Sequence, residues 1–218
     1  MRSLDRVLLL AFDTATPAVT VALRDGSGVL ADRTAVDPRR HGELLAPGIA
    51  RVLADAGRDR SELTGVAVGV GPGPFTGLRV GLVTARALSA SLGIPVYGVC
   101  TLDTVAFASR LTGDYGVATD ARRKEVYWAR YRDRTRIDGP HVDRPDAVGA
   151  KLAGLPVAGQ GPALYPDDFP DAREPHFPSA TALAEWVAAE LPMVPPLPLY
   201  LRRPDAAEPG TRKPVTAR

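Results

Sequence analysis

One stretch constrains the fold of this chain more than any other, a glycine- and proline-rich segment at residues 69–79 with the sequence GVGPGPFTGLR. A valine-rich run at 66–70 leads into this segment, and residues 80–92 after it carry apolar side chains at helical spacing. The pattern predicts a strand, a tight turn and a helix, with Thr76 as the N-cap of that helix. Glycine in such a turn allows positive φ angles and the close approach of a neighbouring backbone. The predicted turn contains Gly71, Pro72, Gly73, Thr76 and Gly77.

This glycine-rich turn matches neither of two common nucleotide-binding signatures. A Walker A loop places a lysine and then Ser or Thr after its last glycine, whereas Leu78 and Arg79 occupy those places here. A dinucleotide-binding fingerprint needs an acidic residue at the end of the next strand, and none closes the strand predicted at 96–99. Pro72 and Pro74 also lack the backbone N–H that would contact a phosphate. Two interpretations stay open, an anion-binding turn and a turn that serves packing alone.

The composition indicates a globular protein of the cytoplasm. The 218 residues suffice for a sizeable core, and a net charge of +2 at pH 7 is too balanced to indicate a nucleic-acid-binding protein from charge alone. The single cysteine, Cys100, cannot form an internal disulfide, which suits a reducing compartment. We expect no secretory leader, because the apolar run at 8–10 continues into Phe12 and Asp13 without a cleavage site. No apolar run is long enough to cross a membrane.

The two halves of the chain begin alike. A short apolar strand ends at Asp13 and a second strand starts six residues later at Val19; in the second half, a strand ends at Asp120 and the next starts six residues later at Val126. This repeated spacing predicts two related subdomains with a cleft between them. With its alternating strands and helices, the chain is predicted to have an α/β fold with mixed sheets flanked by helices.

The expected domain boundaries follow from this repeat. Residues 1–105 form the first subdomain, which carries the glycine-rich turn and its helices, and residues 106–203 form the second. A helix near 180–191 is expected to pack back on the first subdomain. Residues 204–218 are expected to be a flexible basic tail.

Five short motifs spread along the chain resemble the bacterial TsaB (YeaZ-like) family. They are FDTAT at 12–16, GPGPFTGLR at 71–79, DAR at 120–122, EVY at 125–127 and YLR at 200–202. The resemblance implies an actin-like, sugar-kinase-like ATPase fold, which is related to the ribonuclease H fold and is built from duplicated halves. It also implies a role in making N6-threonylcarbamoyladenosine at position 37 of tRNA.

Within that pathway the resemblance implies a non-catalytic scaffold subunit with no catalytic residues of its own. Such a subunit is a degenerate, glycoprotease-like paralogue of the catalytic TsaD-type subunit, which it binds and activates. The resemblance further implies that a TsaE-type ATPase joins through the complex, that the chain alone forms a homodimer, and that it contacts tRNA indirectly. Two other classes of function stay open: an independent ATP-dependent small-molecule kinase or metallopeptidase of the same superfamily, and a stand-alone RNA-binding module.

No metal site is expected. The catalytic paralogue carries a His-x-x-x-His pair after the strand that follows the glycine-loop helix, and that spacing puts two imidazoles on one helical face. Thr101 and Val105 occupy the equivalent places here and cannot replace imidazoles. The three histidines, His41, His141 and His176, are too scattered in the sequence to indicate a site.

A vestigial nucleotide site is a further possibility that the resemblance raises. It would comprise two aspartates at strand ends, the threonine beside the first of them and two glycines: Asp13, Asp120, Thr14, Gly159 and Gly161. The alternative for both aspartates is turn and cap chemistry. We expect no cofactor in the subunit alone, and ATP or ADP only at the interface of a complex.

The helix after the glycine-rich turn carries small residues at three- and four-residue steps, a pattern that allows another helix to approach closely. Such stripes also pack inside their own domain, so core and interface both stay open. The resemblance favours an interface, because the family pairs through the helices of its first subdomain. The candidate interface residues are Phe75, Arg79, Gly81, Thr84, Ala85, Leu88, Leu45 and Ile49.

Two basic segments complete the candidates. Arg122, Arg123 and Lys124 precede the aromatics of the strand that starts at Val126, which suits RNA because cations bind phosphates and aromatics stack on bases. The alternation of those aromatics indicates instead a half-buried strand, with the aromatics in the core. A second basic segment at 39–41 precedes the first helix, where a helix dipole favours acids, and the sequence offers no account of it.

Overall fold

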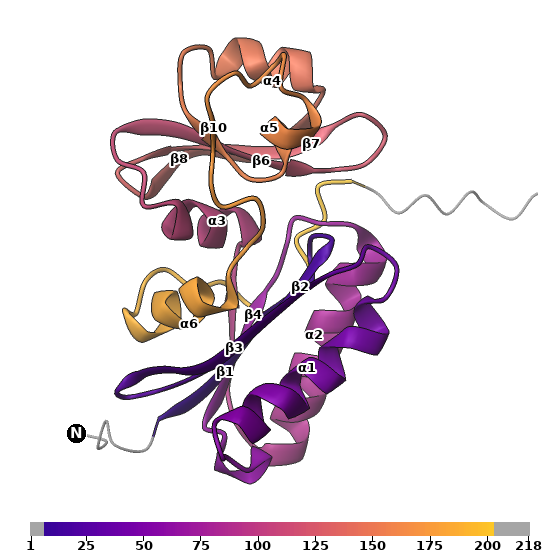
Figure 1. The fold of residues 1–218 in the computed structure, drawn as a ribbon, viewed down its shortest axis with the longest axis vertical. Helices are drawn as coiled ribbons and strands as arrows, with labels where there is room; N and C mark the ends of the chain where they lie inside the picture. Colours follow the sequence, from indigo (N-terminus) through magenta and orange to yellow (C-terminus); the bar gives the residue numbers. More distant parts are fainter. Residues whose placement is uncertain (1–6, 203–218) are drawn as a thin grey trace, which may run out of the picture.

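The computed structural model of the chain describes residues 7–202, which form two α/β halves stacked one above the other (Figure 1). The first sheet has the strand order β3-β2-β1-β4-β5. Its strands are β1 (Leu8–Asp13), β2 (Ala18–Asp25), β3 (Gly28–Val36), β4 (Gly65–Gly69) and β5 (Val96–Val99). The central strand β1 is buried along its whole length, which explains its continuous apolar sequence.

The second sheet repeats the first. Its strands are β6 (Asp114–Asp120), β7 (Val126–Arg132), β8 (Thr135–Asp143), β9 (Val157–Ala158) and β10 (Ala172–Arg173), in the order β10-β9-β6-β7-β8. In both sheets the first three strands pair antiparallel and the last two join them in parallel. The predicted α/β fold with two duplicated subdomains is confirmed, and it is the actin-like fold.

The helices differ between the halves. In the first half, α1 (His41–Asp55) and α2 (Phe75–Leu92) lie side by side on one face of the sheet (Figure 1), and the short 3-10 helix η2 (Arg60–Glu62) follows α1. Their counterparts in the second half, α4 (Pro145–Lys151) and α5 (Gly161–Leu164), are much shorter. Among residues 7–202, no helix is both long and apolar enough to cross a membrane.

The last helix of each half packs on the sheet of the other half. Helix α3 (Thr101–Ser109) follows β5, yet its buried side chains, among them Leu102 and Val105, belong to a core cluster with Tyr115 and Val117 of β6. Helix α6 (Ala180–Ala188) follows β10 and packs on β1, β2 and β4. The expected helix at 180–191 is therefore α6, on the first sheet. The expected domain boundary after residue 105 falls inside α3.

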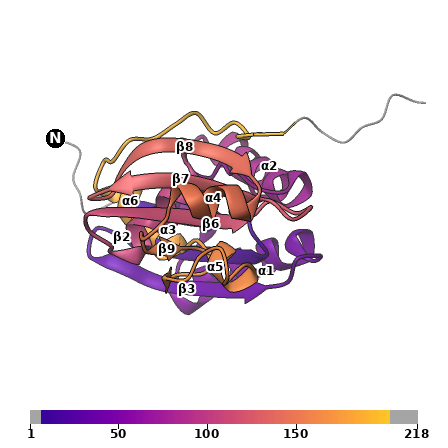
Figure 2. The same ribbon diagram turned by 90° about the horizontal axis from the view of Figure 1, so that it is seen from above.

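After α6 the chain runs along one side of the molecule towards α2 (Figure 2) and touches both halves. The Val194 N–H donates to the Gly98 carbonyl at 2.9 Å, and the Leu199 N–H donates to the Val70 carbonyl at 2.8 Å. The Arg202 guanidinium then donates to the Ala121 carbonyl in the second half at 2.9 Å. The tail expected at 204–218 lies outside the described residues.

One local prediction is wrong, and one strand was not predicted. Helix α2 begins at Phe75, and Pro74 is its N-cap residue without a side-chain cap, so Thr76 lies inside the first turn. Strand β8 was not expected, because its sequence TRIDGPHVD contains Gly139 and Pro140 and has no clear apolar alternation.

Candidate functional site

Asp13, at the end of β1, lies in a closed hydrogen-bond network. One carboxylate oxygen accepts a hydrogen bond from the Ala15 N–H at 2.7 Å, and the other accepts one from the Thr101 hydroxyl at 2.7 Å. Burial raises the pKa of Asp13, against the opposing effect of these two hydrogen bonds. A side chain at Gly69 would overlap the second oxygen. The carboxylate is therefore engaged in turn and packing contacts and faces no open space.

The glycine-rich segment lies directly on the turn between β1 and β2. The contacts repeat every four residues, through Gly69, Gly73, Gly77 and Gly81. A Cβ at Gly73 would overlap the Ala15 carbonyl. At Gly77 and Gly81 it would lie 2.6 Å from the Thr14 carbonyl oxygen and 2.5 Å from the Thr14 hydroxyl oxygen.

Hydrogen bonds of Thr14 fasten this contact. Its hydroxyl donates to the Gly77 carbonyl at 2.8 Å and accepts from the Gly81 N–H at 3.1 Å. The turn between β1 and β2, the place of the expected phosphate contacts, is thus covered by the chain's own backbone. Of the two interpretations of the glycine-rich turn, the geometry fits packing. The four-residue spacing of these glycines is the sequence signal that could have indicated this backbone contact.

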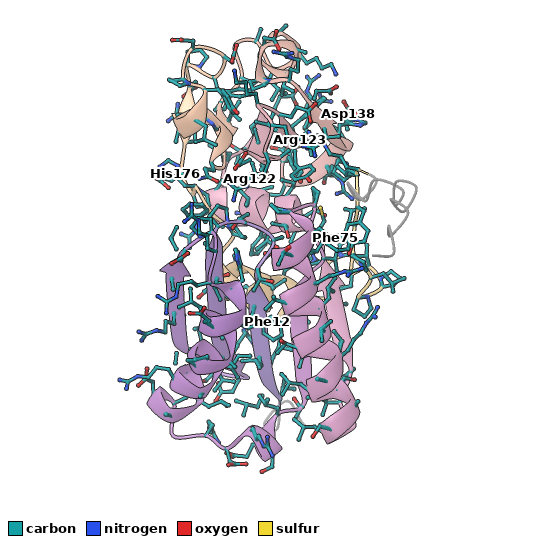
Figure 3. The ribbon with its side chains drawn as sticks, turned by 90° about the vertical axis from the view of Figure 1, so that its right-hand side faces the viewer. Phe12, Phe75, Arg122, Arg123, Asp138 and His176 are labelled. Carbon is teal, nitrogen blue, oxygen red and sulfur yellow. The ribbon has the colours of Figure 1, made fainter. Side chains whose placement is uncertain are left out.

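The two positions that correspond to the histidines of the catalytic paralogue, Thr101 and Val105, make structural contacts. Thr101 bonds through its N–H to the Gly71 carbonyl at 2.8 Å as well as through its hydroxyl to Asp13, and Val105 is buried in the core. Within residues 7–202 no three His, Cys, Asp or Glu side chains gather in a way that could hold a metal ion. His141 lies 2.8 Å from Asp138, and His176 lies on a different segment beside Glu174 (Figure 3).

Asp120 repeats the local chemistry of Asp13 in the second half. One of its oxygens accepts a hydrogen bond from the Arg122 N–H at 2.7 Å, and the other pairs with the Arg122 guanidinium at 3.3 Å. Gly159 and Gly161 follow β9 as the glycine-rich turn follows β4, and side chains at either would collide with Ala118 of β6. Asp13 therefore bonds within the first half and Asp120 within the second, and neither carboxylate lines the pocket described next.

A pocket of ≈ 210 Å³ opens where the two halves meet, beside the turn between β1 and β2. Its walls come from that turn, from the first residues of α1 and α2, and from the turn between β6 and β7. The Nε2 atom of His41 lies 2.7 Å from the Thr16 carbonyl oxygen, and both residues line the pocket. The polar and charged side chains that line it are Thr14, Thr16, Arg39, His41, Thr76 and Arg122.

Four of the eight candidate interface residues belong to the core of the first half instead. Gly81 and Ala85 face the sheet, and Leu45 and Ile49 lie in the same core cluster of the first half. These four residues lie on the sides of α1 and α2 that face the sheet, where the side chains of the other three fill the core and the absence of one at Gly81 lets α2 approach Thr14. Thr84 and Leu88 are half-buried.

Phe75 and Arg79 are exposed but contact the C-terminal segment of their own chain. The Phe75 ring, labelled in Figure 3, stacks on Tyr200 with centroids 5.2 Å apart. The Arg79 guanidinium lies 3.7 Å from the Phe75 ring centroid. Arg79 also donates to the Tyr200 hydroxyl at 3.3 Å. Val83 was not among the candidate interface residues predicted from the sequence. It is 63% exposed and has the most exposed large apolar side chain on α2.

The aromatics of β7 are core residues, as the half-buried-strand interpretation expected. Tyr127, Trp128 and Tyr131 are buried, and the Trp128 indole N–H donates to Asp143 at 2.9 Å. They cannot stack on RNA bases in this arrangement. The basic residues before them are exposed, in a turn where Arg122, Arg123 and Lys124 all have positive φ angles, 61°, 54° and 57°.

The fold and the site together define a class of protein. It is an actin-like α/β protein of two repeats, in which the glycine-rich turn of the chain itself covers the turn between β1 and β2. The family model described as "TsaD: tRNA N6-adenosine threonylcarbamoyltransferase" matches residues 28–166. The solved structure of YeaZ from Pseudomonas aeruginosa superimposes with a TM-score of 0.75 at 28% identity, over 89% of this chain and 100% of that one.

Sequence relatives agree with this class. The Escherichia coli "tRNA threonylcarbamoyladenosine biosynthesis protein TsaB" is 35% identical over 171 residues, which cover 73% of this chain and 74% of the relative. An uncharacterised Mycobacterium tuberculosis protein is 47% identical over 91% of this chain and 93% of its own length. An uncharacterised Mycobacterium leprae protein is also 47% identical, but the chain spans only 57% of its length. The chain belongs to the TsaB (YeaZ-like) family.

Proposed function

We propose that this chain is a non-catalytic subunit in the biosynthesis of N6-threonylcarbamoyladenosine in tRNA, and that it binds and activates a TsaD-type catalytic paralogue. The name of the Escherichia coli relative supports the pathway, and the match to the TsaD family model supports common descent with the catalytic type. The observation that carries the non-catalytic role is the closed turn at Asp13, where the glycine-rich segment occupies the space next to the carboxylate.

The partner surface that we propose is the outer side of α1 and α2, defined by Ala46, Ala50, Ala54, Val83, Ala87 and Ala90 and called the α1–α2 face below. All six residues are exposed, and each helix presents its three at steps of three or four residues. Small side chains at this spacing let two helices of another protein approach closely. In the absence of the catalytic partner, the same face would pair two copies of this chain.

Nucleotide enters this proposal only through a complex. Both oxygens of Asp13 are already engaged, so the chain alone offers no carboxylate for a magnesium nucleotide at that turn. ATP or ADP would then bind where surfaces of both partners meet, and a TsaE-type ATPase would join through the complex. The chain would work in the cytoplasm, where its tRNA substrate is modified.

Light scattering of the chain mixed with the catalytic paralogue of its own organism tests the proposal. Val83→Arg should abolish the complex while circular dichroism and melting stay unchanged, because Val83 is 63% exposed and its replacement disturbs no core. Ile137→Arg is the matched control, since this β8 residue is 45% exposed and lies outside the α1–α2 face.

Three results would contradict the proposal. Absence of a complex between the wild-type proteins would remove the scaffold role. Unchanged binding by Val83→Arg would move the interface away from the α1–α2 face. Tight binding of ATP–magnesium to the chain alone would favour an independent enzyme.

A further inference from the structure

Basic side chains from two distant segments meet at the pocket between the halves. Arg39 comes from the connection between β3 and α1, and Arg122 comes from the turn between β6 and β7, yet both line the same pocket. Figure 3 shows Arg122 near the junction of the halves and Arg123 just above it. We call Arg39, Arg40, Arg122, Arg123 and Lys124 the cationic rim; all five are exposed, and the scaffold role uses none of them.

The nearby acids do not neutralise this pocket. Arg40 pairs with Glu43 at 2.7 Å, and both side chains are largely exposed. An exposed pair of this kind contributes about 0–1 kcal/mol, so a phosphate can replace the Glu43 carboxylate at little cost. The half-exposed Arg122 pairs at 3.3 Å with Asp120, whose side chain is largely buried, and the further N–H donors of its guanidinium can bind a phosphate while that pair stays in place. Within residues 7–202, the Arg39 guanidinium has no ion pair, and no acidic side chain lines the pocket.

The backbone around the pocket also favours a negatively charged ligand. Helices α1 and α2 both begin there, and neither has a side-chain cap on its first N–H groups. The N-terminal end of a helix carries partial positive charge and stabilises an anion. These helix ends reinforce the cations of the rim, which supply the larger share of the field.

The shape of the pocket argues against a free nucleoside phosphate as the occupant. Small-molecule sites enclose roughly 300–1,000 Å³, and this pocket of ≈ 210 Å³ is smaller. Its walls contain no Phe, Tyr or Trp on which a base could stack, the imidazole of His41 is engaged with the Thr16 carbonyl oxygen, and the aromatics of β7 are buried elsewhere. A single phosphate group fits, while the rim continues outside the pocket as a polyanion requires.

We infer that the cationic rim binds the phosphodiester backbone of RNA, with one phosphate in the pocket and its neighbours on the rim. In the context of the proposed function, on which this inference rests, the RNA is the tRNA that the complex modifies. The subunit then contacts tRNA directly, in contrast to the indirect contact that the family resemblance implies. The contact is independent of sequence, because only cations and backbone N–H groups take part.

The test uses the complex of this chain with its catalytic paralogue and measures binding of a labelled tRNA transcript by fluorescence anisotropy at several salt concentrations. The rim variant is Arg39→Glu with Arg122→Glu. The matched control is Arg60→Glu with Arg134→Glu, which makes the same change in charge; Arg134 also lies in a hairpin turn with a positive φ of 69°. We expect the rim variant to bind tRNA at least ~10-fold more weakly, and its log K against log salt slope to fall by about 1.5–2 for two lost phosphate contacts.

The control should change affinity by less than ~2-fold, because both of its sites lie away from the pocket. Light scattering and circular dichroism establish first that each variant folds and forms the complex. If the double Glu variant does not fold, Arg123→Ala with Lys124→Ala replaces it and should weaken binding in the same direction.

Two outcomes overturn the inference. One is a rim variant that forms the complex and binds tRNA as tightly and with the same salt slope as the wild type; the scaffold proposal then stands and the rim inference fails. The other is a rim variant that loses ADP–magnesium binding by the complex while tRNA binding is unchanged, which would make the rim a nucleotide site. Failure of the wild-type proteins to form a complex counts against the proposed function instead, and tRNA binding by the chain alone then tests the rim.

Discussion

The two halves share one strand order but use the same turn differently. Asp13 and Asp120 end equivalent strands, and each accepts a hydrogen bond at 2.7 Å from the backbone N–H two residues later. The second oxygen of Asp13 is buried against Thr101, whereas that of Asp120 pairs with the partly exposed Arg122. The first turn has become part of the core, and the second has stayed at the surface with its cations. Duplication preserved the backbone chemistry and left the side-chain environment free to diverge.

The helices diverged in the same direction. In the first half, α1 has 15 residues and α2 has 18, and together they present the α1–α2 face. In the second half, α4 has 7 residues and α5 has 4, too few to present a comparable helical surface. Partner binding is therefore proposed for the α1–α2 face of the first half alone, whereas both halves contribute to the cationic rim, and variants can separate the two proposals.

The largest effect is expected where the glycine-rich segment lies on the first turn. In Gly73→Ala, the new methyl group would overlap the Ala15 carbonyl, so either the turn or the segment must move. Overpacking of this kind costs about 3 kcal/mol of the free energy of unfolding, measured by urea denaturation. Gly42→Ala is the control, because a Cβ there meets nothing within 4 Å, and we expect a change within about 0.5 kcal/mol. Equal effects of both substitutions would contradict the closed-turn description.

A second comparison removes the two aspartates. Asp13→Ala leaves the buried Ala15 N–H and the Thr101 hydroxyl without their acceptor, and we expect a loss of about 2 kcal/mol. Asp120→Ala leaves the Arg122 N–H in a turn that water can reach, so the loss should be below about 1 kcal/mol. Chemical denaturation of both variants measures the two losses in the free energy of unfolding, which can then be compared. A larger loss for Asp120→Ala would mean that the second turn, and not the first, is the structural one.

The pH dependence of stability tests the same difference between the buried first turn and the exposed second turn, and its expected effect is smaller. Burial raises the pKa of Asp13 above its ordinary value of 3.8, so the folded protein holds this proton to higher pH than the unfolded chain does. The wild type should therefore lose stability relative to Asp13→Asn as pH rises from about 4 through the raised pKa, because the amide stays neutral throughout.

Urea unfolding of both proteins at a series of pH values measures this difference. Asp114 in the second half is the opposite case, because hydrogen bonds from Arg132 and Arg130 lower its pKa. Its contribution is present above pH 4 and is lost as the pH falls further. A difference between wild type and Asp13→Asn that stays constant with pH would show that Asp13 is not buried as described.

The sequence predicted the strand, turn and helix around the glycines and the duplication, because both depend on local patterns. It did not predict that Gly81 and Ala85 are core, since a small-residue stripe has the same spacing whether it faces a sheet or a partner. The contact of Arg79 with Tyr200 joins residues 121 positions apart, and no local pattern reports such a pairing. Arg39 and Arg122 likewise meet only through the fold, which is why neither basic segment indicated a pocket on its own.

The exchange of α3 and α6 between the sheets makes one further prediction about the halves, that they unfold together. The chain has two tryptophans: Trp186 on α6 packs in the cluster of the first sheet, and Trp128 lies in that of the second. In Trp128→Phe the fluorescence reports the first half, and in Trp186→Phe it reports the second. Each substitution can change the unfolding midpoint of the protein by itself. The midpoint followed by fluorescence is therefore compared with the midpoint followed by circular dichroism in the same variant.

We expect the two midpoints to coincide in both variants, because each sheet loses the helix that covers one of its faces once the other half has unfolded. The edge contact between Phe107 of α3 and Trp186, with ring centroids 5.6 Å apart, couples the exchanged helices directly. A fluorescence transition that precedes the circular dichroism transition in one variant alone would mean that this half opens independently. The pocket between the halves would then have no fixed geometry in the free subunit, and the cationic rim would have to be assembled by the catalytic partner.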